Sequence, residues 1–445
     1  MPRRKANARL PEAPVTARIE SCCHDGRGLT HLDGRVTFVE GALPGERVEF
    51  VYTEMKRDFA CAKTIRVLEA SPLRVEPKCE YFGICGGCTF QHVDPERQIE
   101  VKQQILEDQL RRIAHLNDIP IWPPIRGPSW AYRHKARLSV KYVPKKRRAL
   151  VGFNEKATRL VADIGHCEVL NSRIGNKLAD IAELVTNLSI RDRIPQIEIA
   201  VGEPGSCVLV FRNLCAASAE DRVLLKDFGA KHDFAIYLQP GGPDSLCRVD
   251  QDAALAMGYT LPAHNVRLEF KALQFTQVNF ELNRRMVDRA IQLLAPGPTD
   301  RVIDLYCGIG NFTLPIARYA LCVVGVEGNR ELIEQATMNA RSNELENVRF
   351  QVADLNSELA HETWCRDSYS LALLDPSRAG AEAILKYFPH WGVKRLVYIS
   401  CNPATLARDA AILSADFGYR IQGVGVMDMF PHTSHIESIA LFEKA

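Results

Sequence analysis

The 445-residue sequence has no apolar run approaching the ~18 residues that cross a bilayer, and its N-terminus lacks the hydrophobic region of a secretory signal. We therefore expect a cytoplasmic protein without a membrane-spanning segment. An excess of one charge is also lacking, because 56 basic and 54 acidic residues give a formal net charge of +2. This balance does not by itself indicate a nucleic-acid-binding protein. No element is typical of self-association, so we expect a monomer.

A disulfide framework is not indicated either, although the sequence contains 14 cysteines. In a chain without a secretory signal, clustered cysteines more often bind metal or take part in catalysis. Cys79, Cys85 and Cys88 follow the spacing C-x5-C-x2-C, with glycines between them that let the backbone wrap around one centre. Cys167, which follows a polar strand end, is the best candidate for a fourth ligand.

Four thiolates fit either a tetrahedral zinc ion or an iron–sulfur cluster, and the spacing leaves both open. The unequal spacing differs from the paired C-x2-C motifs that are common at zinc sites. We expect a structural role for this metal centre, because it would hold together a loop-rich region that has little hydrophobic core of its own.

Residues 12–73 contain short β-rich runs separated by turn formers such as Asp33-Gly34 and Pro44-Gly45. About five short strands at this spacing predict a small closed β-barrel of the OB type. The runs Gly26-Arg27-Gly28 and 38–46 resemble the TRAM domain, an RNA-binding barrel found in RNA-modifying enzymes. Basic and aromatic residues on one face would contact RNA, or would form a solvated face; these are Lys56, Arg57, Phe59 and Lys63.

Residues 74–270 predict a central α+β domain. An amphipathic helix is expected over residues 94–116, and it is a candidate to pack on the C-terminal domain. Strands are expected at 136–143, 197–201, 207–211 and 235–238. Apart from the cysteines, this region has no motif that indicates a particular chemistry.

Residues 271–445 alternate strands with helices, which predicts a doubly wound, mostly parallel α/β sheet of the Rossmann-like type. The expected strands are 301–306, 321–327, 348–352, 370–375 and 396–400. The last of these ends at Cys401, at the edge where open α/β sheets bind their ligands. A buried cysteine is often only a small hydrophobic residue, so this position alone leaves a structural role open.

The first of these strands leads into a turn with Gly308 and Gly310, which permits close approach of a nucleotide-type ligand. Thr313 stands where the dinucleotide fingerprint has its third glycine, and Glu327, 17 residues after Gly310, is placed to bind ribose hydroxyls. Both a nicotinamide cofactor and S-adenosylmethionine fit this pattern. Asp304 favours S-adenosylmethionine, because a carboxylate would repel a pyrophosphate; the alternative is an NAD-dependent oxidoreductase.

Five ordered motifs resemble those of the RNA 5-methyluridine methyltransferases, which methylate uracil C5 with S-adenosylmethionine. They are residues 275–279, 304–312, 374–380, 400–403 and 430–437. The TRAM-like barrel together with the cysteine cluster resembles the branch that acts on uracil 1939 of 23S rRNA and carries a 4Fe–4S cluster. The resemblance covers nearly the whole chain. Alternatives are a tRNA methyltransferase with the same chemistry and an inactive, RNA-binding relative.

The resemblance implies a role for each matching residue. Cys401 would be the nucleophile and Glu437 the base, with His435 as an alternative base. The cofactor site would be lined by Gln277, Tyr306, Asn311, Glu327, Asp354 and Asp375. Cys79, Cys85, Cys88 and Cys167 would hold the 4Fe–4S cluster.

The chemistry explains why these residue types are needed. Uracil C5 is a weak nucleophile, and addition of a thiolate to C6 turns the ring into an enolate with negative charge at C5. A base must then remove the C5 proton so that the thiolate is expelled. No lysine or arginine adjoins Cys401 in the sequence, so its activation must come from the fold. The target base must leave the stack or lie in a loop.

Overall fold

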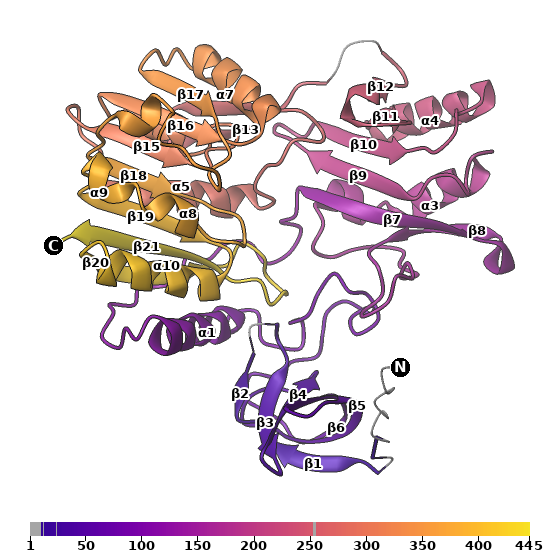
Figure 1. Cartoon of the computed structure of the whole chain (residues 1–445). Coiled ribbons are helices and arrows are strands. Elements are labelled where there is room, and N and C mark those ends of the chain that lie inside the picture. Colours follow the sequence, from indigo (N-terminus) through magenta and orange to yellow (C-terminus); the bar gives the residue numbers. More distant parts are fainter. Residues whose placement is uncertain (1–9, 12, 24, 252–254) are drawn as a thin grey trace, which may run out of the picture.

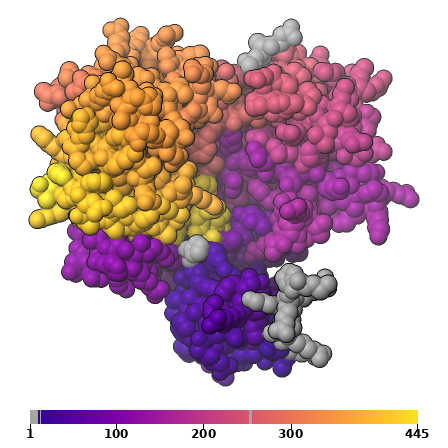
Figure 2. Space-filling view, viewed as in Figure 1, coloured from indigo at the N-terminus to yellow at the C-terminus, as the bar shows by residue number. Residues whose placement is uncertain are grey.

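The computed structural model describes residues 10–445 except 12, 24 and 252–254, so the first residue of the predicted barrel lies outside the described residues. Three large sheets follow one another along the chain (Figure 1). The N-terminal barrel lies below the other two parts, as its indigo atoms in Figure 2 show. Across the described residues, no helix has the length and apolar character that crossing a membrane requires.

The first sheet has the strand order β1-β5-β6-β4-β3-β2. Its two edge strands are consecutive in the chain, and the residues between them bond to both sides: Ile19 N–H donates to Glu46 O and Glu20 N–H to Leu29 O, each at 2.8 Å. These bonds join the two edges of the sheet around a small apolar core; the sequence predicts about five short strands here, and the structure describes six. The strands are β1 (Val15–Arg18), β2 (Ser21–Cys22), β3 (Gly28–Leu32), β4 (Arg35–Glu40), β5 (Arg47–Met55) and β6 (Phe59–Glu69).

The second sheet has the order β12-β11-β10-β9-β7-β8 and is antiparallel except for the β10–β11 pair. Helices α3 and α4 contribute buried residues to its core. The elements are β7 (Lys135–Val143), η1 (Pro144–Lys146), β8 (Arg148–Gly152), α2 (Ser172–Gly175), α3 (Leu178–Asn187), β9 (Gln196–Val201), β10 (Cys207–Arg212), α4 (Ala219–His232), β11 (Ala235–Gln239), η2 (Pro243–Ser245) and β12 (Cys247–Arg248).

The third sheet confirms the predicted doubly wound α/β fold. Its order is β17-β16-β15-β18-β19-β21-β20, and the first five strands are parallel. Two antiparallel strands, β20 and β21, extend it beyond β19. The strands are β15 (Arg301–Leu305), β16 (Cys322–Glu327), β17 (Val348–Val352), β18 (Leu371–Leu374), β19 (Arg395–Ser400), β20 (Tyr419–Met427) and β21 (Glu437–Lys444).

Helices cover both faces of this sheet, because alternate strand residues point to opposite sides. Val397 joins the core with α5, α6 and α7, whereas its neighbours Leu396 and Tyr398 join the core with α1, α8, α9 and α10. The helices are α1 (Gln98–Ile113), α5 (Phe280–Leu294), α6 (Thr313–Ala317), α7 (Arg330–Ser342), α8 (Glu382–Leu385), α9 (Phe388–Trp391) and α10 (Pro403–Ala415), with the 3-10 turn η4 (Trp364–Arg366).

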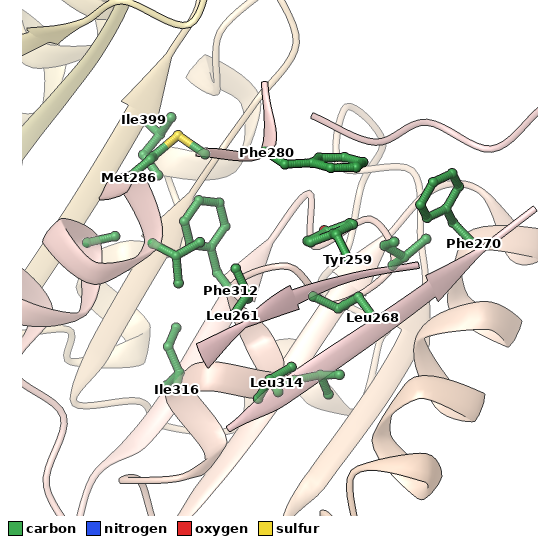
Figure 3. Close-up of a cluster of buried hydrophobic side chains, with 14 of the residues drawn as sticks. Tyr259, Leu261, Leu268, Phe270, Phe280, Met286, Phe312, Leu314, Ile316 and Ile399 are labelled. Carbon is green, nitrogen blue, oxygen red and sulfur yellow. The ribbon is translucent and has the colours of Figure 1, made fainter. Parts of the chain in front are cut away.

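A hairpin links the second and third sheets. It consists of β13 (Met257–Leu261) and β14 (Val266–Phe270), joined by η3 (Pro262–His264). Tyr259 of this hairpin stacks on Phe280 of α5, with ring centroids 4.9 Å apart. Figure 3 shows both rings in the apolar cluster that also holds Phe312 and Ile399. The hairpin therefore supports the face of the sheet that carries α5.

Helix α1 precedes the second sheet in the chain but packs on the third (Figure 1). It begins at Gln98, later than predicted, because Asp94 forms a turn in which its side chain accepts from Glu96 N–H at 2.9 Å. Its apolar face, with Ile99, Leu106 and Leu110, shares a core with α10 and β20. The chain then runs beside β20, where Trp122 covers Gly423.

Candidate active site

A cleft of about 530 Å³ opens at the edge of the third sheet where its parallel strands end. β15, β18 and β19 lead into Tyr306, Asp375 and Cys401, which all line the cleft. β21 runs antiparallel to β19, and Ser438 pairs with Ser400, so the first residue of β21, Glu437, lies at the same edge as Cys401. Topology thus brings the predicted nucleophile and the predicted base to one site.

Most of the predicted cofactor residues also line this cleft: Gln277, Tyr306, Asn311, Glu327 and Asp375. Asp354 differs, because it lies past the end of β17, is exposed, and is not among the lining residues. Its carboxylate accepts from Asn356 N–H at 3.0 Å and so shapes the turn after the strand. Asp354 stands at the same edge of the sheet as the cleft but outside it.

The glycine turn after β15 has the backbone shape that its sequence predicts. Gly308 and Gly310 have φ values of +56° and +95°, and Tyr306 before them has +65°. Positive φ is accessible to glycine without steric cost. Gly308 N–H donates to Glu327 Oε2 at 3.3 Å, so the carboxylate at the end of β16 is held against the turn. The carboxylate of Glu327 and a backbone that a ligand can approach closely therefore lie side by side on the cleft wall.

The side chain of Asn311 is oriented by two residues that the sequence patterns did not single out. Its amide group exchanges two hydrogen bonds with Asn283 of α5, each 2.9 Å long. Its oxygen also accepts from Tyr259 Oη at 2.9 Å. Asn283 and Tyr259 are both buried, so this network fixes the cleft wall next to the glycine turn.

Asp304 lies beneath the turn and is completely buried. Thr313 Oγ1 donates to one of its carboxylate oxygens, and the other has no hydrogen-bond partner. Burial raises the pKa of Asp304 to about 7. The carboxyl group therefore supports the turn from inside and is set back from the cleft surface.

Two acidic groups that line the cleft, Glu437 and Asp375, hold their protons more tightly than in water. Burial raises the pKa of Glu437 to about 8, with a further contribution from the neighbouring charge of Asp375. Burial likewise raises the pKa of Asp375 to about 7. The pKa of the Cys401 thiol rises to about 11, first through burial and then through the negative charges of Glu437 and Asp375.

Among the described residues that line the cleft, Arg378 is the one lysine or arginine. Its positive charge acts against the negative charges of Glu437 and Asp375, because it lowers the pKa values of both Cys401 and Glu437. Its Nη2 donates to His435 Nδ1 at 3.0 Å. Burial and the charge of Arg378 lower the pKa of His435 to about 4. Arg378 belongs to the motif at 374–380, but nothing in its sequence pattern indicates this role.

A second pocket is lined by all four predicted metal ligands, Cys79, Cys85, Cys88 and Cys167. The glycines between them permit close packing: a Cβ on Gly86 would lie 2.9 Å from Asn154 O, and one on Gly87 would lie 3.0 Å from the Phe153 ring. All four cysteines are free thiols. Within the described residues, however, no group of three or more His, Cys, Asp or Glu has an arrangement that would hold a metal ion.

The doubly wound sheet, the glycine turn and the acid at the end of β16 fit the α/β methyltransferase fold that uses S-adenosylmethionine. Residues 96–445 match the family described as tRNA (Uracil-5-)-methyltransferase. The chain belongs to this family.

Curated relatives resemble the chain over nearly its whole length. The 23S rRNA (uracil(1939)-C(5))-methyltransferase RlmD of Methylococcus capsulatus is 49% identical over 435 residues, covering 98% of each chain. The enzyme of the same name from Legionella pneumophila strain Paris is 44% identical over 443 residues, covering 99% of this chain and all of its own. The fold is similar to that of Pyrococcus abyssi tRNA (uracil-54, C5)-methyltransferase, with a TM-score of 0.71, 23% identity and coverage of 96% and 99%.

Proposed function

We propose that the chain methylates C5 of a uracil in 23S rRNA, at the position equivalent to uracil 1939, with S-adenosylmethionine as the methyl donor. The observation that carries this proposal is the meeting of Cys401 and Glu437 in one cleft, at the facing ends of β19 and β21. The curated relatives support 23S rRNA as the substrate, because they resemble the chain over its barrel and cysteine pocket as well as its C-terminal part.

In the first half of the proposed reaction, the Cys401 thiolate adds to C6 of the uracil. The electrons of the C5–C6 double bond move toward the C4 carbonyl, and the resulting enolate makes C5 nucleophilic. S-adenosylmethionine supplies the methyl group that C5 takes up. The guanidinium of Arg378 is suited to stabilise negative charge in this part of the cleft.

In the second half, Glu437 removes the C5 proton, the C5–C6 double bond forms again, and the Cys401 thiolate leaves. A general base works best when its pKa is close to the working pH. Glu437, with a pKa of about 8, meets this condition better than His435, whose pKa is about 4. In addition, His435 Nδ1 already accepts a hydrogen bond from Arg378. These observations favour Glu437 as the base.

The residues around the glycine turn fit S-adenosylmethionine. Glu327 would bind the ribose hydroxyls, and the backbone at Gly308 permits close approach of the ligand. Gln277, Tyr306, Asn311 and Asp375 would contact the rest of the molecule from the cleft wall. Asp354 is proposed only as a residue of the outer rim, since it is exposed and lies outside the cleft.

The mouth of the cleft fits an unstacked RNA base. Phe275 is 67% exposed there, although large aromatic side chains are usually buried. Exposed aromatic rings stack on bases of single-stranded or looped RNA. The N-terminal barrel, proposed to be a TRAM domain, would bind a neighbouring part of the same RNA. Such a substrate would also place the protein in the cytoplasm, where we propose that it is a monomer.

We further propose that the four cysteines hold a 4Fe–4S cluster. Free thiols that line a common pocket match the donor set of such a cluster. Four thiolates also fit a single zinc ion, so the metal and sulfide content of the purified protein decides between the two groups. The role of the cluster would be to hold the loop of residues 79–92 against the second sheet.

The test is transfer of labelled methyl from S-adenosylmethionine to 23S rRNA and to bulk tRNA, both from cells that lack the enzyme. We expect label in 23S rRNA alone, as 5-methyluridine at one position. Label in tRNA would keep the chemistry but overturn the proposed substrate. A lack of label in both RNAs, with an enzyme that binds S-adenosylmethionine, would overturn the proposed activity.

A further inference from the structure

The base Glu437 stands at the end of a loop that is held mainly from outside the third sheet. This loop, residues 428–436, joins β20 to β21 and brings Phe430 and His435 to the cleft. It contains His432, whose φ of +65° is rarely adopted by residues other than glycine. A loop with such a backbone needs strong contacts to keep one conformation.

Lys102 of α1 supplies one of these contacts. Its side chain is 1% exposed, and its Nζ donates to Asp428 Oδ1 at 2.8 Å and to Phe430 O at 3.0 Å. A buried ammonium is stable only when such partners surround it. Lys102 thus binds the first and the third residues of the loop, from an element 326 positions earlier in the chain.

Gln98, one turn earlier on α1, binds the middle of the loop. Its Oε1 accepts from His432 N–H at 2.7 Å, and its Nε2 lies 3.0 Å from His432 Nδ1. The same Nε2 donates to the backbone oxygens of Phe90 and Val93. Gln98 is completely buried. One amide side chain therefore ties the strained residue of the loop to α1 and to the segment that follows Cys88.

We infer that Gln98 and Lys102 are positioning residues for Glu437: α1 holds the loop that presents the base, and the buried ammonium of Lys102 also acts on the base through its charge. Neither residue lines the cleft, so their effect must pass through the loop and through the electric field. This inference rests on the proposed role of Glu437 as the base.

The electrostatic part depends on all charged groups that face Glu437. Asp375, after β18, raises the pKa of Glu437, whereas Lys102 on α1 and Arg378 lower it. Cys401, after β19, faces the same carboxyl group. Removal of the Lys102 charge therefore leaves Glu437 protonated up to a higher pH. Replacement of Gln98 by an uncharged residue removes no charge, so the pKa of Glu437 should stay as it is in the parent enzyme.

The experiment compares Lys102→Met and Gln98→Met in the full-length enzyme, with Arg112→Met as the control on the exposed side of α1. A misplaced base slows only elimination, which follows methyl transfer. We therefore expect kcat to fall about 10–100-fold in both variants, with kcat/KM unchanged and a denaturation-resistant enzyme–RNA adduct on unmodified RNA. In Lys102→Met alone, the rise of kcat with pH should also move to higher pH.

The inference would be overturned if kcat and kcat/KM fell equally and no enzyme–RNA adduct formed. This result counts only for a variant that binds S-adenosylmethionine like the parent enzyme. An unmoved pH profile in Lys102→Met would overturn its electrostatic part. If Lys102→Met does not fold, Gln98→Met still decides whether α1 positions the base. Failure of the proposed function would be seen differently, because the parent enzyme itself would then transfer no methyl group to uracil.

Discussion

Replacement of Glu437 by glutamine should stop the reaction at a defined point. The amide has nearly the shape of the carboxyl group but cannot accept the C5 proton. The variant also lacks the negative charge that Glu437 carries when it is ionised, and this charge is one of the causes that raise the pKa of Cys401. Addition and methyl transfer should therefore proceed, whereas elimination should slow by the ~10²–10⁴-fold that general bases contribute.

The assay is a rapid-quench measurement with labelled methyl donor and excess target RNA. Glu437→Gln should transfer about one methyl group per enzyme and then stall, with the label and the RNA in a denaturation-resistant adduct. The double variant with Cys401→Ala should lose this adduct. Steady turnover by Glu437→Gln at the parent rate would refute the assignment, and the same stall in His435→Gln would move the base to His435.

When elimination limits the rate of the parent enzyme, kcat should rise about tenfold from pH 7 to pH 9. The reason is that Glu437, with a pKa of about 8, is about one-tenth ionised at pH 7 and about nine-tenths ionised at pH 9. A flat pH profile in that range would contradict the raised pKa of Glu437. RNA with 5-fluorouridine at the target should trap the parent enzyme but not Cys401→Ala, and an equal yield would exclude this nucleophile. Anaerobically purified protein should contain iron and sulfide and lose both in Cys88→Ser; stoichiometric zinc without sulfide would refute the 4Fe–4S cluster. Gly423→Ala should lower stability by about 1–3 kcal/mol in thermal unfolding, because its Cβ would lie 2.5 Å from the Trp122 ring; Gly425→Ala, at 3.3 Å, should cost less.

Four parallel strands of the third sheet, β15, β16, β18 and β19, were predictable because they are buried on both faces. Such strands read as continuous apolar runs, and turn residues mark their ends. Val348–Val352 was predicted with its observed bounds, and the other four parallel strands differ by one residue at one or both ends. The cleft was predictable for the same reason, since strand ends in a parallel sheet gather at one edge. Cys401 could therefore be assigned to that edge from its position alone.

The contacts that hold the proposed base, Glu437, were not predictable in this way. Lys102 and Asp428 are 326 positions apart, and Gln98 and His432 are 334 apart, so no local pattern relates them. The charged residues of α1 instead have the usual appearance of a solvated helix face. The antiparallel pairing of β21 with β19, which brings Glu437 to Cys401, is likewise a property of the topology. Sequence periodicity identifies a strand there but not its partner.

The burial of Glu437 helps both halves of the proposed reaction. Ionisation of Cys401 places a negative charge beside Glu437 and Asp375, and each of these groups raises the pKa of the thiol when it is itself ionised. A Glu437 with a pKa of about 8 is mostly protonated at neutral pH, so it does not oppose the thiolate while that forms. Once the sulfur is bound to C6 it carries no negative charge, so it does not oppose the ionisation of Glu437 at the step where a base is needed. A solvated carboxylate with an ordinary pKa would suit only the second step, because it would be ionised from the start and would disfavour the nucleophile.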